Sequence, residues 1–441
     1  MREDKKSELT PRLRFPEFRE AAGWKETPLS SIAKPISEKA TEVDSGTALT
    51  LSSEQGIIQQ GDYFGKAIAG NNPERYIKIV RDDFVYNDRI TKSSIYGTIK
   101  RLSKCDGGIV SPIYKCFRFN GGENPIFWDM YFESGTHETE LSKLTNEGAR
   151  VGRYNISIDK FLSLSGWRPS PAEQQKIADC LGTLDELIEA QSRKLDALKA
   201  HKKGLMQNLF PREGETTPRF RFPEFQDAPE WEMKALGELL LSKPDYGINA
   251  PAVPYSDLLP TYLRITDISD DGISLRNGRV SVDVEPVADI FLEDGDIVFA
   301  RTGASVGKSY KYRPRDGRLV FAGFLIRVRP DLRKLNSSFF YQYLSTRRYW
   351  DWVAITSPRS GQPGINGDEY ASLPVPLPSC SAGSKSMEEQ NRIADALSFV
   401  DELIVFQMEK LEALKTHKKG LMQQLFPRET ESEKLEIRSE K

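Results

Sequence analysis

The chain has 441 residues, of which 38% are hydrophobic and 29% are charged, and its formal net charge is −2 at pH 7. This length allows two or three domains, each with its own hydrophobic core. A run of about 18 apolar residues is absent, which excludes a membrane-spanning helix, and the charged N-terminus is unlike a secretory signal. The cysteines lie far apart without metal-ligand spacing, at Cys105, Cys116, Cys180 and Cys380. These features predict a reduced, cytoplasmic protein that does not associate with membranes.

Two segments are locally basic although the whole chain is nearly neutral. Residues 75–118 hold ten Lys or Arg against four Asp, and residues 301–333 hold nine against two Asp. One basic segment in each half of the chain is the pattern expected of a surface that meets DNA phosphates twice. A solvated face crossed by salt bridges is the alternative explanation.

Short strands and helices are predicted along both halves. Runs of β-branched or aromatic residues bounded by Gly, Asp or Pro indicate strands at residues 84–86, 113–119, 262–265, 296–300 and 325–328. One helix is expected at residues 337–352, which begin with serine and have helical apolar spacing. Prolines at residues 169–171 and 374–378 indicate stiff segments before two long helices, because proline fixes φ and disfavours helix just before it.

One block of sequence occurs twice. Residues 177–212 and 393–428 are identical at about 25 of 36 positions. A second repeated segment, Thr-Pro-Arg-x-Arg-Phe-Pro-Glu-Phe, begins at Thr10 and at Thr217, and each copy is followed by a tryptophan. Between these repeated frames the two halves have nearly equal length but share almost no sequence. The pattern predicts two versions of one fold with different binding surfaces.

The repeated block is typical of a coiled coil. Apolar residues recur at alternating steps of four and three, with one central glutamine in each copy. These positions are Ile177, Leu181, Leu184, Ile188, Gln191, Leu195 and Leu198 in the first copy, and Ile393, Leu397, Val400, Ile404, Gln407, Leu411 and Leu414 in the second. Independent packing of each helix on its own domain is the alternative.

Charge gives the pair of helices a direction. Each helix is acidic early and basic late, so an antiparallel pair sets acid against base. It would bring Gln191 and Gln407 to adjacent central layers, where they could bond to each other. It would also leave Lys202 and Lys418 at the ends, with their amines in reach of water.

The predicted fold class is therefore α+β, with two pseudo-repeated globular domains separated by a long antiparallel two-helix coiled coil. The expected boundaries are a first domain with its N-terminal segment at 1–168, a first helix at 169–212, a linker and second domain at 213–380, a second helix at 381–428 and a charged tail at 429–441.

Loops after two predicted strands carry side chains that can reach DNA bases. Arg and Lys recognise guanine and Asn recognises adenine. The segments 152–156 and 361–365 match each other late in the two halves, and a purely structural turn is the alternative for both. The predicted DNA contacts are Asn87, Arg89, Lys92, Lys100, Arg153, Arg301, Lys308, Lys311 and Arg359.

Gly303-Ala-Ser-Val-Gly-Lys-Ser309 is one residue shorter than the nucleotide-binding P-loop. A P-loop also needs a helix directly after its lysine, whereas residues 309–314 alternate like a strand and reach a proline. A glycine-rich turn between two strands is predicted instead.

The chain has three histidines, of which His201 and His417 are repeat mates, and neither a metal cluster nor a nucleophile motif is recognisable. No catalytic residue and no metal site are predicted.

The duplicated frame resembles the specificity subunit of type I restriction-modification enzymes. The resemblance is carried by Glu173-Gln174 and Glu389-Gln390 with the Ile-Ala pairs that follow them, by the Leu-Asp-Glu-Leu-Ile-like segments, by the Lys-Lys-Gly-Leu-Met-Gln ends and by residues 296–303. It covers essentially the whole chain. It implies two target-recognition domains, each reading one half of a bipartite, asymmetric DNA site.

The resemblance also implies partners. They are two modification subunits that methylate adenine with S-adenosylmethionine, and restriction subunits that move along and cut DNA with ATP and Mg. The chain itself would then bind no cofactor and catalyse no reaction. Two other classes of function stay open, namely a P-loop NTPase and an assembly adaptor that does not contact DNA.

Overall fold

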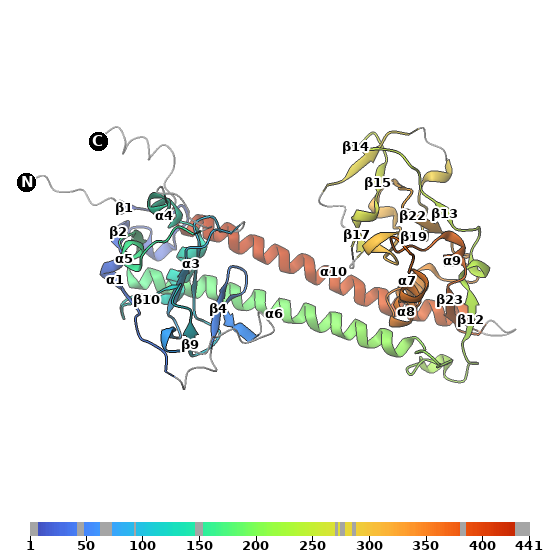
Figure 1. The fold of residues 1–441 in the computed structure, drawn as a ribbon, viewed down its shortest axis with the longest axis horizontal. Coiled ribbons are helices and arrows are strands. Elements are labelled where there is room, and N and C mark those ends of the chain that lie inside the picture. Colours follow the sequence, from blue (N-terminus) through green and yellow to red (C-terminus); the bar gives the residue numbers. More distant parts are fainter. Residues whose placement is uncertain are drawn as a thin grey trace, which may run out of the picture. The chain divides into compact units, whose positions relative to one another are not determined.

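The computed structural model describes residues 8–41, 48–61, 73–91, 94–145, 153–269, 272–273, 278–284, 288–379 and 385–427 (Figure 1). Backbone contacts divide the chain into unit 1, residues 1–192 and 410–441, and unit 2, residues 193–409. Two long helices, α6 (Pro171–Leu209) and α10 (Ser386–Leu425), each contribute one half to unit 1 and the other half to unit 2. The sequence analysis placed the domain boundaries at the ends of these helices, whereas the two units divide within them. The predicted boundaries stay a prediction. In the described ranges, no helix has the length and apolar character needed to cross a membrane.

A four-stranded antiparallel sheet forms the centre of unit 1. Its strand order is β3 (Ala33–Pro35), β10 (Lys115–Phe119), β7 (Phe84–Asn87) and β8 (Thr98–Arg101). Smaller sheets pair β4 (Leu49–Ser52) with β5 (Gly56–Gln59), β6 (Ile77–Val80) with β9 (Gly107–Val110), and β2 (Trp24–Pro28) with both β1 (Glu8–Leu9) and β11 (Ser165–Arg168). Besides the long pair, this unit contains the helices α1 (Leu29–Ile32), α3 (Pro125–Glu133), α4 (Glu138–Leu144) and α5 (Ile158–Leu162) among its described residues.

The core of unit 1 is aromatic. Helix α3 begins where the Asn124 side chain accepts hydrogen bonds from the amides of Ile126 and Phe127, and it buries one face against the central sheet. The rings of Phe119 on β10 and Trp128 on α3 stack with centroids 4.8 Å apart. This packing fixes the sheet on the helices.

Unit 2 repeats the central sheet. Its order is β13 (Asp245–Tyr246), β22 (Leu325–Val328), β19 (Ile297–Ala300) and β20 (Ser309–Lys311), again antiparallel. A second sheet has the order β14 (Ala252–Pro254), β18 (Val280–Val282), β15 (Thr261–Leu263) and β21 (Leu319–Phe321), and the last two strands are parallel. Two-stranded pairs join β12 (Glu232–Ala235) to β23 (Pro374–Leu377) and β16 (Ile268–Ser269) to β17 (Gly272–Ile273). The short helices are α7 (Ser337–Tyr343), α8 (Arg347–Thr356) and α9 (Gly367–Ala371).

The predicted single helix at residues 337–352 is wrong, because two helices occupy this segment. Helix α7 ends at Tyr343, and Thr346 then adopts an extended backbone conformation. The Thr346 hydroxyl accepts a hydrogen bond from the Tyr349 amide and so caps a new helix, α8. Ser345 and Thr346 favour such a cap because their hydroxyls compete with helical hydrogen bonds. The apolar spacing continued across this cap and concealed the break.

The two units are versions of one fold, as the repeat predicts. In both central sheets the equivalent strands occupy equivalent places: β10 corresponds to β22, β7 to β19 and β8 to β20. The five strands expected from the sequence are present, although the strand predicted at 113–119 begins only at Lys115 and the strand predicted at 262–265 ends at Leu263, before a 3-10 helix. The frame around these sheets is repeated while their loops differ.

The long helices run antiparallel. In unit 1 the start of α6, with Ile177 and Leu181, shares a core with Leu425 at the end of α10. In unit 2 Leu209, at the end of α6, shares a core with Ile393 at the start of α10. The apolar heptad positions of both helices are buried or half-buried throughout. The predicted α+β fold with an antiparallel helix pair is therefore confirmed.

The two lysines expected to end in water are instead held by acids. Lys418 is only 8% exposed, and its Nζ lies 2.8 Å from Asp185 and 3.2 Å from Glu133. Lys202 forms the equivalent ion pair with Asp401 in unit 2, at 2.7 Å. Asp185 and Asp401 are repeat mates, so one ion pair fixes the same antiparallel register in both units.

The lysine–aspartate ion pairs do not test the predicted pairing of the two central glutamines. Gln191 belongs to unit 1 and Gln407 to unit 2, where Gln407 is 2% exposed. Their pairing stays a prediction.

Reversing the charge of one partner in unit 2 tests the helix register. Asp401→Lys sets two ammonium groups together and should lower the free energy of unfolding by about 1 kcal/mol. Adding Lys202→Asp should recover most of that loss, because the pair is then restored with opposite polarity. Urea denaturation of the two single variants and the double variant measures the coupling.

Asp395→Lys is the matched control, since Asp395 is an exposed acid on the same helix. It should change stability by less than about 0.5 kcal/mol. If the losses of the two single variants simply add in the double variant, the helices do not hold this register.

A buried histidine gives unit 1 a specific dependence on pH. His137 packs edge-on against Phe132, its Nδ1 has no hydrogen-bond partner within the described ranges, and burial lowers its pKa to about 4. The unfolded chain, with an ordinary pKa of about 6.5, binds more protons between these two values. Stability is therefore complete above pH 6.5 and falls as the pH drops toward 4.

His137→Phe should remove this part of the pH dependence. Relative to the variant, the wild-type chain should lose about 2 kcal/mol of unfolding free energy between pH 7.5 and pH 5. Urea denaturation at the two pH values measures it. Equal pH dependence in both proteins would mean that His137 titrates normally in the folded state.

Candidate nucleic-acid interface

The same polar contacts seat the globular part of each unit on a long helix. In unit 1, Arg14 donates from Nε and Nη2 to the Glu173 carboxylate, both at 2.8 Å, and Glu173 lies in the first turn of α6. Gln174 accepts a hydrogen bond from the backbone amide of Asn124, the residue that caps α3. The globular part of unit 1 is thus tied to the helix at its N-terminal segment and at α3.

Unit 2 uses equivalent residues. Arg221 donates to both oxygens of Glu389 at 2.7 Å, and Gln390 accepts from the backbone amide of Asn336, which caps α7. In this unit the Trp231 indole also donates to Glu389. The second arginine of each Thr-Pro-Arg-x-Arg segment, Arg14 or Arg221, therefore binds the glutamate at the start of a long helix. Sequence analysis did not assign it this role.

One edge of each central sheet carries the loops predicted to meet DNA. Strands β7 and β19 end there, and their antiparallel neighbours β10 and β22 begin there, with Lys115 opposite Tyr86 and Leu325 opposite Ala300. The second residue after each strand, Arg89 or Thr302, forms a β-bridge with the chain segment that returns before α5 or α9. The two units therefore present equivalent loops.

In unit 1 a buried carboxylate organises this edge. Asp88 is fully buried and accepts from Lys115 Nζ at 2.7 Å, from the Ile156 amide at 3.1 Å and from Arg153 Nη1 at 3.3 Å. Arg153 also donates to the Asn87 side chain at 3.2 Å. The structure thus brings together three of the predicted contacts, Asn87, Arg89 and Arg153.

Of the other predicted contacts of unit 1, Lys100 does not lie at this edge. Lys92 lies outside the described residues. Lys100 is on β8 opposite Val85, within electrostatic range of the carboxylates of Asp129 and Asp185.

In unit 2 an arginine takes the place of the buried acid. Arg301 is the first residue after β19, as Asp88 is after β7, and its guanidinium lies 5.0 Å from the ring centre of Tyr246. Its backbone is held on both sides, by the Phe324 carbonyl at 3.1 Å and by the Ile365 amide at 2.9 Å. The arginine is therefore fixed at the edge with its charge over an aromatic face.

The glycine-rich segment forms the predicted turn. A short 3-10 turn at Gly303–Ser305 follows β19, and Lys308 leads directly into strand β20. Gly303 and Gly307 have φ of +71° and +87°, and a β-carbon on Gly307 would lie 2.8 Å from Val353. Without a helix after Lys308, its backbone amides cannot form the phosphate cradle of a P-loop.

Two further predicted contacts of unit 2 are engaged within the protein. Lys311 is on β20 opposite Ile297, at the other end of β19 from Arg301, and its Nζ donates to Ser338 at 2.8 Å. Burial lowers the pKa of this lysine. Arg359 donates to both oxygens of Glu369 at 2.6 Å.

Ion pairs reduce the positive charge counted from the sequence. Each of the four Asp in residues 75–118 pairs with a cation of the same segment: Asp82 with Arg101, Asp83 with Arg118, Asp88 with Lys115 and Asp106 with Arg81. The salt-bridged alternative thus accounts for part of this segment. Arg89 and Arg153 lie at the loop edge together with Lys115, whose amine is paired with Asp88.

Two residues at these edges were missed by sequence reasoning. Tyr246 comes from a strand 55 positions before Arg301, and no local pattern connects them. Asp88 was passed over because it is an acid within a basic loop, although that contrast was the available clue.

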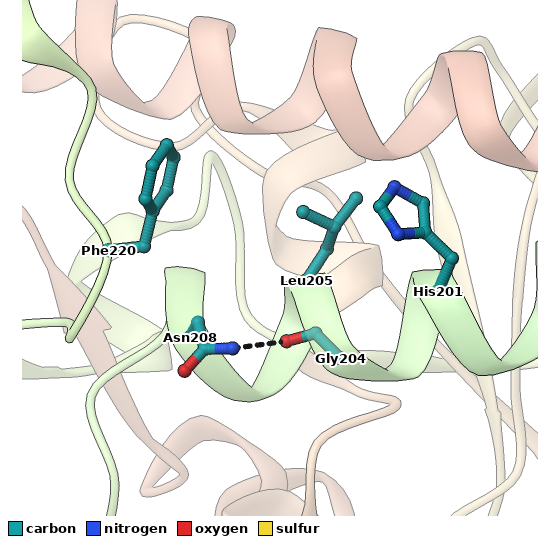
Figure 2. Close-up of a pocket in the computed structure, with 5 residues that line it drawn as sticks. All are labelled: His201, Gly204, Leu205, Asn208 and Phe220. Carbon is teal, nitrogen blue, oxygen red and sulfur yellow. Dashed lines mark hydrogen bonds between the residues drawn. The ribbon is translucent and has the colours of Figure 1, made fainter.

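A cavity of about 440 Å³ lies in unit 2 at the end of α6 (Figure 2). It is lined by His201, Gly204, Leu205, Asn208 and Phe220, and the Asn208 side chain is turned to the Gly204 carbonyl at 2.8 Å. The lining is almost entirely apolar and lacks a second titratable group for acid–base chemistry. Across the described part of the chain, no group of three or more His, Cys, Asp or Glu is arranged to hold a metal ion.

Comparison with known proteins finds relatives of one kind. The chain is 24% identical over 327 residues to the type I restriction enzyme MjaVIII specificity subunit of Methanocaldococcus jannaschii, covering 69% of this chain and 71% of that protein. It is 23% identical over 261 residues to the Escherichia coli type I restriction enzyme EcoDI specificity subunit, covering 54% and 56%. No family model matches the chain.

The fold has the same neighbours. The S subunit of a type I restriction-modification system from M. genitalium matches with a TM-score of 0.59 at 16% identity, over 96% of this chain and all of that one. A chain from a structure of a type I R-M system, described for its complex assembly, matches with a TM-score of 0.50 at 17% identity, over 95% and 99%. The family resemblance expected from the sequence is confirmed, and neither the NTPase nor the adaptor finds support.

The buried carboxylate of unit 1 gives a stability prediction. Asp88→Ala leaves Lys115, Arg153 and the Ile156 amide without their shared acceptor, and should cost about 3 kcal/mol of unfolding free energy. Asp88→Asn keeps an acceptor oxygen and should cost less. Thermal and urea denaturation measure both variants, and an unchanged stability for Asp88→Ala would contradict the role assigned to this carboxylate.

Proposed function

We propose that this chain is the DNA-specificity subunit of a type I restriction-modification complex, and that each unit reads one half of a bipartite, asymmetric DNA site. The observation that carries the proposal is the equivalent sheet edge of the two units. The same strands, in the same order, end in loops of different chemistry: Asp88 with its two cations in unit 1, and Arg301 over Tyr246 in unit 2. Different chemistry on one frame suits the recognition of two different sequences.

The side chains at these edges suit base recognition. Arginine donates two parallel hydrogen bonds to guanine, and asparagine pairs with adenine in the same way. The Arg301 guanidinium lies over the Tyr246 ring and the Arg153 guanidinium pairs with Asp88, so both side chains are held before any DNA arrives. A side chain held in place loses less entropy on binding, so the same contact contributes more to affinity.

The repeated ends of the long helices support two copies of one partner. Four exposed residues are the same in both copies although no core contact requires it: Lys199, His201, Lys203 and Gln207 on α6, and Lys415, His417, Lys419 and Gln423 on α10. Exposed residues near the middle differ instead, as Ala190 and Phe406 do. A surface present once in each unit suits the two modification subunits of such a complex.

The apolar cavity beside His201 lies within this repeated surface of unit 2. It fits an apolar side chain of such a partner better than a polar cofactor. In this proposal S-adenosylmethionine, ATP and Mg are bound by the modification and restriction subunits. The present chain then positions DNA and performs no catalytic step.

Single-molecule sequencing of the host genome, with and without the gene, tests the function. Deleting the gene should remove adenine methylation at one bipartite asymmetric motif, and returning it should restore that motif. An assembly adaptor predicts instead that Arg301→Ala with Lys308→Ala leaves the choice of motif unchanged. Tight ATP binding by the isolated chain that is lost in Lys308→Ala would favour the NTPase.

The Arg301 side chain gives a quantitative prediction for the assembled complex. Arg301→Ala should weaken binding to the specific duplex about ten-fold and relax the base preference at one position of one half-site. Arg333→Ala is the matched control, because Arg333 follows the far end of β22 and pairs with Asp331. Fluorescence anisotropy with duplexes altered at single positions measures both. A loss that is equal at every position would assign Arg301 to a phosphate rather than a base.

A further inference from the structure

Both units expose an apolar side chain at the same place in their fold. Ile113, 48% exposed, lies in the turn before β10, and Phe324, 58% exposed, lies in the turn before β22. These strands are equivalent in the two central sheets. The surrounding sequences are unrelated, so the shared feature is the position and its apolar character.

The two turns have the same backbone arrangement. The Tyr114 amide donates to the Ser111 carbonyl at 3.1 Å, and the Leu325 amide donates to the Ala322 carbonyl at 2.8 Å. Ile113 and Phe324 each occupy the third residue of their four-residue turn. Glycine and asparagine are common at this place, and the turn itself does not call for isoleucine or phenylalanine.

The turn in unit 2 is rigid. The Gly323 amide donates to the Ile248 carbonyl at 2.8 Å, and the Phe324 carbonyl accepts from the Arg301 amide. The neighbouring backbone is so close that a β-carbon on Gly247 would lie 2.2 Å from the Phe321 carbonyl. The Phe324 ring is therefore held out from a fixed turn directly beside Arg301.

The turn in unit 1 is held in a related way. Pro112 fixes one φ, and the Ile113 carbonyl accepts from Lys115 Nζ, the same amine that is paired with Asp88. Both apolar tips thus lie against the groups that form the candidate DNA edge of their unit.

We propose that Ile113 and Phe324 insert between neighbouring bases, one in each half-site, and partly unstack one base step there. The inference rests on the proposed function and adds a mechanism of recognition to it. Phenylalanine and isoleucine are among the side chains that proteins wedge into base steps, and the cost of unstacking depends on the step. Steps that unstack easily would be favoured, so each tip contributes to the choice of sequence without a hydrogen bond to a base.

The test uses the full complex with its modification subunits and a duplex carrying the specific site. The fluorescent base 2-aminopurine, which brightens when unstacked, replaces one base at a time across both half-sites. The wild-type complex should raise fluorescence at one step in each half-site, in addition to the position of the flipped target adenine. Phe324→Ala should abolish the rise in the half-site read by unit 2 and weaken binding about ten-fold.

Ile113→Ala should abolish only the fluorescence rise in the half-site read by unit 1. Phe324→Trp should retain the rise in the half-site read by unit 2. Leu332→Ala is the matched control, since Leu332 is also 58% exposed but follows the opposite end of β22. Because both tips are exposed, their truncation should leave the melting temperature of the chain unchanged.

Weaker binding of Phe324→Ala with the fluorescence rise intact would overturn the insertion and leave a surface contact. Unchanged binding and fluorescence would overturn it as well. A wild-type complex that shows no preference for any duplex would instead overturn the proposed function, and the insertion with it.

Discussion

A buried arginine–glutamate pair ties the N-terminal segment of each unit to the first turn of a long helix. Glu173 and Glu389 are each about 1% exposed, and Arg14 and Arg221 donate two hydrogen bonds to them. Burying both charges adds little net stability, because desolvation offsets their attraction, but leaving one charge unpaired costs several kcal/mol. The pair therefore acts by excluding other arrangements of segment and helix. Every loop at the candidate interface takes its position from a domain that is seated in this way.

The same seating explains how the two units can differ so much at the loop edges proposed to meet DNA. The frame of each unit, consisting of the Arg–Glu pair, the Gln contact to the capped helix and the lysine–aspartate register contact, is complete without the residues of the loop edge. Unit 2 has a half-buried arginine, Arg301, where unit 1 has a buried acid, Asp88, and the strand order is the same in both. Folding and recognition thus rest on separate sets of side chains.

Periodic features of the sequence predicted the structure well. Individual contacts between residues that are distant in the sequence could not be predicted from it. The heptads, the antiparallel direction and the central strands follow from spacing and charge that are visible along the chain. Arg14 and Glu173 are 159 positions apart, and the arginine–tyrosine contact at Arg301 depends on a strand from elsewhere in the sheet. The lysines at the helix ends were assigned to water because the acids that hold them lie on the other long helix and, for Glu133, on α3. At the loop edge, the residue types were predicted, but which side chains were already paired could be seen only in three dimensions.

The turns that carry Ile113 and Phe324 show how a recognition residue can change at little cost. Their conformation is set by backbone hydrogen bonds and by neighbouring residues, and the exposed side chain contributes nothing to the core. Substitution at such a position alters the outer surface with a small effect on stability. A change of residue there therefore alters which base step is favoured, while the seating of the domain on the helix stays the same. The same reasoning fails for Asp88, whose replacement would remove a buried acceptor, so the position of that acid is constrained by folding as well as by DNA.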